Sequence, residues 1–340
     1  SANVYALSLA IYCTSWTFYG SVGRATSGGF SFLTIYIGPT LMMLCVGVII
    51  KMIRISKAQR ITSIADFIAS RYGKSQLLAG MVTVIAVIGV VPYIALQLKA
   101  MAASVDVLLD HTGSNGEVLG LDSTFLIAIV LALFSILFGT RHLDATERHE
   151  GMVAAVAFES VVKLCAFVAV GLFVTYGMFG GLGDLFQKAS ASADLSRLLQ
   201  LDSGRAGTWT SLIVLSGLAI IFLPRQFQII VVENVDESHL KRAVWLFPLY
   251  LLVINIFVLP LALGGLIHFG GASADPDTFV LTLPLARGAE AMALLAFIGG
   301  LSAATGMVIV ETIALSTMVC NDLVMPWLLR STWLQTENGK

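Results

Sequence analysis

Long runs of apolar residues constrain the fold of this 340-residue chain more than any other feature. Most are close to 20 residues long or longer, which is the length that a helix needs to cross the hydrocarbon core of a bilayer. Open strands would leave backbone groups without hydrogen bonds in lipid, so the spans must be helices. We predict an all-α polytopic membrane protein, a single domain over 1–340, with about eight spans at 3–22, 30–50, 76–109, 123–140, 151–179, 209–232, 244–269 and 289–320.

The composition supports a membrane protein and disfavours other classes. Charged residues make up 12% of the chain, against about 25% in soluble domains. The net charge of −1 gives no reason to expect a nucleic-acid partner. We find no phosphate-binding loop, nucleophile motif or metal-ligand spacing, and the ligand-rich loop 141–150 is typical of solvated ion pairs. We therefore expect no enzyme activity, cofactor or metal site in this chain, whose ends we expect to be internal to a longer protein.

Basic residues indicate the orientation of the spans. Between residues 51 and 74 the chain has six Lys or Arg and a single acid, Asp66. Under the positive-inside rule this segment is cytoplasmic. Eight crossings then place 141–150, 233–243 and both ends of the chain on the same side. Within the basic segment, Thr62 or Ser63 is suited to cap a short amphipathic helix over 61–72 on the cytoplasmic surface.

Two of the predicted spans contain residues that interrupt a helix. The first holds a Cys-Thr-Ser-Trp-Thr run at 13–17 ahead of several glycines, and the sixth holds Pro-Arg-Gln at 224–226. Helices broken in mid-membrane expose backbone groups that bind substrates or ions. The alternative is a glycine-rich packing face with an ordinary proline kink, because both residue types are common in membrane helices.

Ionisable residues inside the spans are costly in lipid and therefore point to function. Lys163 lies near the middle of the fifth span, one helical turn after Glu159, and such a pair partly neutralises itself. The alternative is a buried pair that only locks helix packing. Glu311, deep in the eighth span, has no partner nearby in the sequence and must be protonated, hydrated or paired across helices.

Several strings resemble one family. Together they resemble the sodium/solute symporter family and, more narrowly, the transporter-like N-terminal domain of CbrA-like bacterial sensor histidine kinases. The resemblance covers essentially the whole chain and implies an inverted-repeat, LeuT-like fold, truncated here, with the first and sixth core helices broken. The strings are YCTSWTFYG (12–20), ITSIADFIASRYGK (61–74), LPRQF (223–227), VVEN (231–234), GLSAAT (300–305) and CNDL (320–323).

The resemblance implies a solute site at the two broken helices and the third core helix. There, Trp16 and Tyr93 would shield the solute, Gln97 would hydrogen-bond it, and the backbone opened near Pro224 would hold its charged end. The implied substrate-binding residues are Ser15, Trp16, Thr17, Tyr93, Gln97, Pro224, Arg225 and Gln226.

Departures from the family pattern bear on the coupling ion. Sodium-coupled members often have an acid where this chain has Tyr12, and a Ser-Thr pair of sodium ligands where it has Gly306 and Met307. Sodium prefers several oxygen ligands, so we do not expect it to bind tightly here. Our hypothesis is that the ammonium group of Lys163 replaces sodium, giving proton coupling or no cation coupling. The predicted coupling site consists of Lys163, Glu159, Ser302, Thr305 and Glu311.

These observations predict a sensor and transporter domain in the bacterial inner (plasma) membrane. The resemblance implies that it binds and transports a small polar solute, an amino acid such as histidine or a small carboxylate. It further implies that the domain reports occupancy to an attached histidine kinase, outside this chain, that acts on a response regulator. Two alternatives stay open: a stand-alone secondary active symporter, and a receptor that binds a solute without transporting it.

Overall fold

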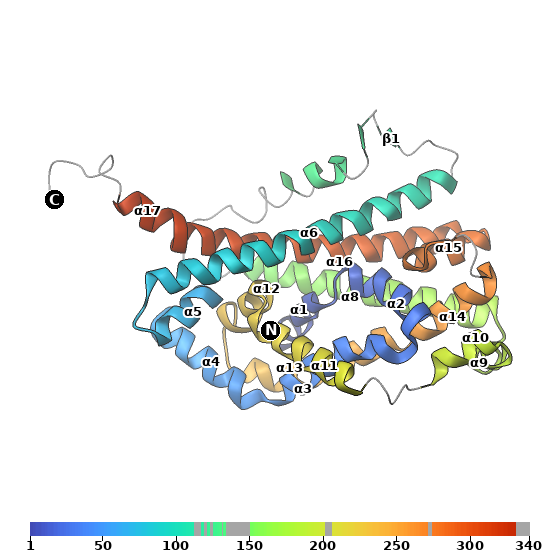
Figure 1. Cartoon of the computed structure of the whole chain (residues 1–340), viewed down its shortest axis with the longest axis horizontal. Helices are drawn as coiled ribbons and strands as arrows, with labels where there is room; N and C mark the ends of the chain where they lie inside the picture. Colours follow the sequence, from blue (N-terminus) through green and yellow to red (C-terminus); the bar gives the residue numbers. More distant parts are fainter. Residues whose placement is uncertain are drawn as a thin grey trace.

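The computed structural model is a bundle of helices whose long members run along one axis (Figure 1). It describes residues 1–111, 117–118, 121–122, 125–130, 132–133, 150–200, 206–270 and 274–330. The predicted fourth span, 123–140, and the loop 141–150 therefore lie largely outside the described residues. Within the described part, the strands are one short antiparallel pair, β1 (Glu117–Val118) and β2 (Leu121–Asp122).

Helices long and apolar enough to cross a membrane match the predicted spans. In the described part five segments meet this condition, and a bent pair of helices makes a sixth. They correspond to six of the eight predicted spans, and the shorter apolar helix Ala2–Tyr12 corresponds to the first. Their outward faces carry large apolar side chains such as Leu77, Ile88 and Phe158, which are 68–77% exposed. Because such faces suit lipid and not water, the chain is an integral membrane protein. The six segments are Trp16–Leu44, Gln76–Leu109, Gly151–Met178, Ser238–Phe269, Glu290–Leu329 and the pair Ala206–Phe222 with Pro224–Val232.

The first helix is broken near its middle. α1 (Ala2–Ser8) continues as a 3₁₀ turn, Leu9–Tyr12, and stops at Cys13, whose ψ of 99° is extended. The chain becomes helical again in a π turn, Trp16–Gly20, that leads into α2 (Ser21–Gly28). Gly29, with φ of 51°, then redirects the chain into α3 (Thr34–Leu44), which a 3₁₀ turn, Gly29–Leu33, precedes.

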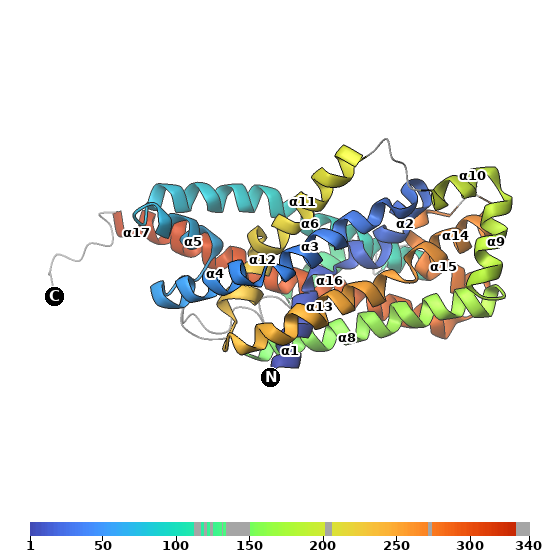
Figure 2. The same ribbon diagram turned by 90° about the horizontal axis from the view of Figure 1, so that it is seen from below.

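The sixth span is broken in a similar way. α11 (Ala206–Phe222) ends before Leu223, whose ψ of 130° is extended, and α12 (Pro224–Phe227) starts with Pro224 in its first turn. Proline suits that position because its missing N–H would have no partner there. The two parts are bent by 54°. α1 and α12 lie near the middle of the long axis in two perpendicular views (Figures 1 and 2), as the resemblance implies for broken core helices.

The basic segment 51–74 is more helical than predicted. α4 (Val46–Gln59) extends past residue 50, so Lys51, Arg54 and Lys57 lie on this helix. The short predicted helix is confirmed as α5 (Ile64–Arg71), in which the Ser63 hydroxyl accepts a hydrogen bond from the Asp66 N–H (3.1 Å). These two helices and α17 (Met325–Arg330) lie at the left end of Figure 1, and α9 (Leu182–Ala191) and α10 (Ala193–Ser196) lie at the opposite end.

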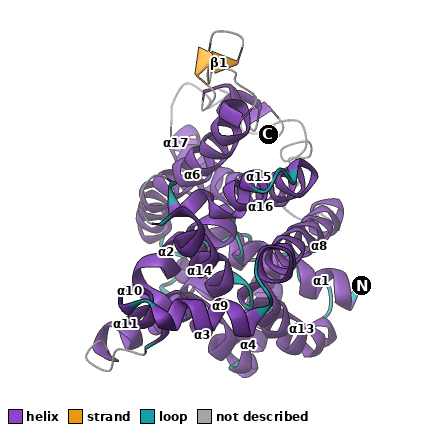
Figure 3. Ribbon diagram, turned by 90° about the vertical axis from the view of Figure 1, so that its right-hand side faces the viewer, coloured by secondary structure: helices purple, strands orange, loops and turns teal. Residues whose placement is uncertain are grey.

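The remaining helices complete the bundle, which Figure 3 views along its long axis. The largest contacts join α3 to α11 and α16 to α8. One 3₁₀ turn, Arg197–Leu199, follows α10, and another, Pro276–Thr278, precedes α15. Three other helices continue into π turns, at Phe173–Met178, Gln228–Val232 and Cys320–Val324. The other helices are α6 (Gln76–His111), α8 (Glu150–Leu172), α13 (Ser238–Asn255), α14 (Val258–Phe269), α15 (Phe279–Ala286) and α16 (Glu290–Val319).

Candidate solute and coupling site

The ammonium group of Lys163 fills the break in the first helix. Its Nζ donates hydrogen bonds to the backbone carbonyls of Ala10 (2.8 Å) and Cys13 (2.7 Å), and the residue is 3% exposed. The Ala10 carbonyl also accepts a hydrogen bond from the Cys13 N–H (3.0 Å), whereas the break leaves the Cys13 carbonyl outside the helical ladder, in a medium that supplies no donor. Lys163 on α8 therefore satisfies the backbone of a helix about 150 residues away in sequence.

Glu159 lies one turn earlier on α8 and faces a different helix. Its Oε1 accepts a hydrogen bond from the Thr305 hydroxyl (3.1 Å), and its backbone carbonyl accepts one from the Ser302 hydroxyl (3.0 Å). The expected ion pair with Lys163 does not form, because α16 binds the carboxylate and the broken helix binds the ammonium group. A methyl group at Gly306 would overlap Glu159 Oε2, so this glycine provides the space for the carboxylate.

Two side chains of α6 contact the break in the first helix. The Tyr93 hydroxyl is hydrogen-bonded to the Thr14 hydroxyl (3.1 Å). Gln97 Oε1 accepts hydrogen bonds from both the backbone N–H and the hydroxyl of Ser15, at 3.1 and 2.5 Å. In this structure Gln97 therefore binds the broken helix, whereas the prediction had it bind a solute.

Arg225 and Glu311 form a buried ion pair between the second break and α16. Arg225 Nη1 lies 2.6 Å from Glu311 Oε2, and the two side chains are 1% and 0% exposed. The guanidinium group also lies over the ring of Tyr93, 4.9 Å from its centroid. Glu311 thus pairs across helices, one of the predicted options, but with the solute-site residue Arg225 and apart from the coupling residues on α8. Arg225 Nε, Glu311 Oε1 and both amide atoms of the buried Gln226 have no partner within the described part of the chain.

A cavity of about 660 Å³ opens between α6 and α11 beside the two breaks. Five of the eight predicted solute-binding residues line it, and the other three, Ser15, Gln97 and Gln226, are buried next to the breaks. Apolar side chains form most of the remaining wall, so the polar groups are concentrated at the breaks. The lining residues from the predicted set are Trp16, Thr17, Tyr93, Pro224 and Arg225.

Sequence reasoning missed three features of the site. The sequence marked Thr14 only as part of the run at 13–17 and did not mark the Ala10 carbonyl, because their partners lie 79 and 153 residues away. Gly306 was seen only as a missing ion ligand, although its lack of a side chain has a positive role. Of the four cysteines, Cys13 is buried beside this site, and Cys45, Cys165 and Cys320 are exposed. Among the described residues no cluster of His, Cys, Asp or Glu side chains is suited to hold a metal ion.

Membrane-crossing helices with two central breaks, and with charged side chains gathered at those breaks, are typical of secondary transporters. Comparison with known proteins agrees with this class. No family model matches the chain. The chain is 25% identical over 289 residues to the uncharacterized symporter YhjB of Bacillus subtilis (strain 168), an alignment that covers 83% of this chain and 55% of that protein. The chain therefore spans about half the length of the relative that it matches.

A solved structure has the same fold. The chain is similar, with a TM-score of 0.66, to a Na⁺-coupled sialic acid symporter in a substrate-bound outward-open state. The similarity covers 100% of this chain and 68% of that one, at 14% sequence identity. At this identity the likeness establishes the fold alone.

Proposed function

We propose that the chain binds a small polar solute, an amino acid such as histidine or a small carboxylate, and transports it across the bacterial inner membrane. Both ends of the chain would face the cytoplasm. The observation that carries this proposal is the Lys163 ammonium group in the break of the first helix, beside a cavity that Arg225 lines. An ordinary packing helix has no need of a buried cation bound to its backbone, because its own N–H groups would satisfy those carbonyls.

A ligand screen on the purified protein tests solute binding. Amino acids, including histidine, and small carboxylates are added in turn, and the melting temperature is measured. A solute that binds only the folded protein raises the melting temperature as its concentration exceeds Kd. The Arg225→Gln variant should lose this shift, whereas Arg54→Gln, a control at the surface, should keep it. A panel in which no solute shifts the melting temperature would contradict the proposal.

The proposed coupling mechanism follows from Lys163. A lysine ammonium group carries one positive charge to the two carbonyls that a metal cation would otherwise contact, so the proposed coupling uses protons or no cation. The solved symporter is sodium-coupled, which makes sodium the alternative coupling ion. Uptake into proteoliposomes, measured with a sodium gradient, with a proton gradient and with neither, separates these cases. Strict dependence on sodium would refute the role given to Lys163.

We also propose that an attached histidine kinase reads the occupancy of this site. This step rests on the sequence resemblance of TSIADFIASRYGKS (62–75) and LPRQFQIIVVEN (223–234) to that kinase group. A kinase module in the same polypeptide would support it, and a stand-alone symporter would lack such a module. If the solute binds but is not taken up by proteoliposomes, the domain is a receptor without transport activity.

A further inference from the structure

We propose that Glu159 accepts the proton of Lys163, and that Gly306 and Thr305 position its carboxylate for this exchange. The inference rests on the coupling role proposed for Lys163. In the exchange, the proton leaves Lys163 Nζ and binds a Glu159 carboxylate oxygen, which converts an ammonium–carboxylate pair into an amine and a carboxylic acid. The net charge of the two groups stays at zero, and no other reactant is needed.

The placement of the two groups on α8 supports the exchange. Residues four apart on a helix share a face and are separated by about 6 Å along the axis. In this structure each group is bound by a different neighbour, Lys163 by the broken first helix and Glu159 by α16. If the broken segment moves away, Lys163 loses the two carbonyls that stabilise its charge, and a neutral amine becomes favourable in this apolar setting.

The two oxygens of Glu159 have different surroundings. Oε1 accepts the Thr305 hydrogen bond, and Oε2 occupies the space beside Gly306, where it receives no hydrogen bond from the described residues. Oε2 is therefore the oxygen available to accept a proton. Glu159 is also partly exposed while Lys163 is 3% exposed, so the acceptor is the more accessible member of the pair.

Other charged and titratable groups near Lys163 do not compete for this role. The Arg225 guanidinium group faces the site from α12, but Glu311 is already bound to it at 2.6 Å. The Cys13 thiol faces it from the first helix, and Tyr250 of α13 donates its hydroxyl hydrogen bond to the Ser160 carbonyl (2.8 Å). Among the described residues at this site, Glu159 is the carboxylate without a cation bound to it.

The test is an infrared titration of the reconstituted protein, which needs no solute. A protonated carboxylic acid has a carbonyl stretching band that a carboxylate lacks, and the band is followed from about pH 5 to pH 9, a range that buried carboxyl groups reach. We expect a titrating band that disappears in Glu159→Gln. In Lys163→Met the same band should titrate with about a tenfold higher proton affinity, because the adjacent positive charge is gone.

The positioning role of Gly306 is tested by a size exchange. Gly306→Ala should change the proton affinity of Glu159 by about threefold or more. In the double variant Gly306→Ala/Glu159→Asp the shorter side chain leaves space for the added methyl group, so the aspartate should titrate as Glu159 does in the wild type. Gly151→Ala is the matched control, since this glycine on α8 has no atom within 4 Å of an added methyl group. If Gly306→Ala does not fold, Thr305→Val removes the hydrogen bond at nearly constant volume.

Two outcomes overturn the inference. The first is that no band responds to Glu159→Gln, and the second is that the band is unaffected by Lys163→Met, as a purely structural hydrogen bond to Thr305 would predict. Either can occur while solutes still bind and are transported, so failure here is distinct from failure of the proposed function.

Discussion

At the scale of single residues, the site is organised by groups that lipid leaves without partners. The break leaves the Cys13 carbonyl without a donor from its own helix, and Lys163 carries an ammonium group that lipid would exclude. Each alone is unfavourable in a membrane, but together they satisfy one another. The sequence identifies such residues one by one as costly, and only the fold brings them together.

Gly38 determines how closely α3 packs on α11. An added methyl group there would overlap the Ser216 hydroxyl and the backbone of α11 at Ile213 and Gly217. We expect Gly38→Ala to lower the free energy of unfolding by about 1–3 kcal/mol, the usual cost of overpacking. Gly89→Ala on α6, where no atom lies within 4 Å, should leave it unchanged or slightly higher. Melting temperatures in detergent compare the two, and equal losses would show that the contact is unimportant.

Asp277, in the 3₁₀ turn before α15, gives the stability of the protein a pH dependence. Burial, and the charge of nearby Asp275, raise the pKa of Asp277 above its ordinary value of 3.8. The folded protein therefore binds this proton more tightly than the unfolded chain, so the stabilisation is present at low pH and is lost as the pH rises through the folded pKa. The melting temperature of Asp277→Asn should equal that of the wild type at low pH and exceed it at neutral pH, which a series of melting curves from low to neutral pH would show.

Asp184 is a control, because its contribution to stability should depend on pH in the opposite direction. Hydrogen bonds from Lys188 and from the Gly180 N–H lower the pKa of Asp184, so its contribution is present at neutral pH and is lost as the pH falls through the folded pKa. Asp184→Asn should therefore be the less stable protein at neutral pH and should approach the wild type in acid. If the two variants respond to pH in the same direction, one of the two assignments is wrong.

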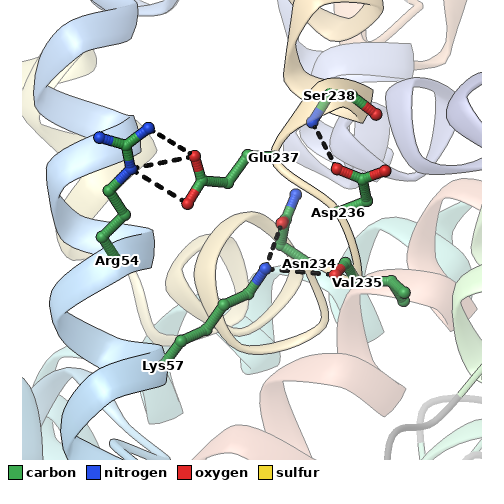
Figure 4. A network of polar contacts seen from close by, with 7 residues as sticks. All are labelled: Arg54, Lys57, Asn234, Val235, Asp236, Glu237 and Ser238. Atoms are coloured by element: carbon green, nitrogen blue, oxygen red, sulfur yellow. Dashed lines mark hydrogen bonds and ion pairs between the residues drawn. The ribbon is translucent and has the colours of Figure 1, made fainter.

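At the scale of elements, polar contacts join α4 to the segment that follows the second broken helix (Figure 4). Arg54 Nε donates to both carboxylate oxygens of Glu237, at 3.1 and 3.0 Å. Lys57 Nζ donates to Asn234 Oδ1 and to the Val235 carbonyl, each at 3.2 Å. Asn234 belongs to the VVEN string, so part of that string ties two elements together.

The Arg54–Glu237 contact should behave as a surface ion pair. Arg54→Glu and Glu237→Arg alone should each lower the melting temperature slightly, because each places like charges opposite one another, and the double exchange should restore it, because opposite charges face each other again. Salt should weaken the effect by screening. Arg54 also lowers the pKa of Glu237, so the contact is lost as the pH falls through that pKa. Lys51→Glu on the same helix is the control; an equal loss there would mean that net charge, not the contact, is responsible.

The sequence predicts where helices break but not which distant residues pair. Pro224 and the 13–17 run predicted the two breaks, because proline and small polar residues act locally on the backbone. The predicted span ends at residue 50 whereas α4 continues to Gln59, since Lys and Arg can lie on a helix that extends beyond an apolar span. The partner of Glu311 lies 86 residues away, and no local pattern encodes such a pairing.

At the scale of the whole molecule, one connected set of contacts spans the bundle at the level of the breaks. Thr14 contacts Tyr93, Tyr93 lies against Arg225, and Arg225 is paired with Glu311. The set therefore links both broken helices to α6 and α16. The proposed solute, in the cavity beside Tyr93 and Arg225, would contact members of this set directly.

Substitutions of Arg225 and Glu311 test whether this buried ion pair contributes to the stability of the fold or to solute binding. Removing one partner, in Arg225→Met or Glu311→Met, leaves an uncompensated buried charge and should lower the free energy of unfolding by about 3–5 kcal/mol. Replacing both with methionine removes the charges together, and buried pairs replaced in this way are often neutral or more stable. We therefore expect the double variant to unfold within about 1 kcal/mol of the wild type, the tolerance of a nearly volume-conserving change.

Denaturant titrations of the four proteins complete a double-mutant cycle, and the same samples enter the ligand screen. If the double variant is as stable as the wild type but no longer responds to any solute, the pair is present for binding, because its contribution to stability is close to zero. Additive losses in the two single variants would instead show that Arg225 and Glu311 act independently. A stable double variant that still binds solute would leave the unpaired amide of Gln226 and the cavity-lining Trp16 and Thr17 as the groups that recognise it.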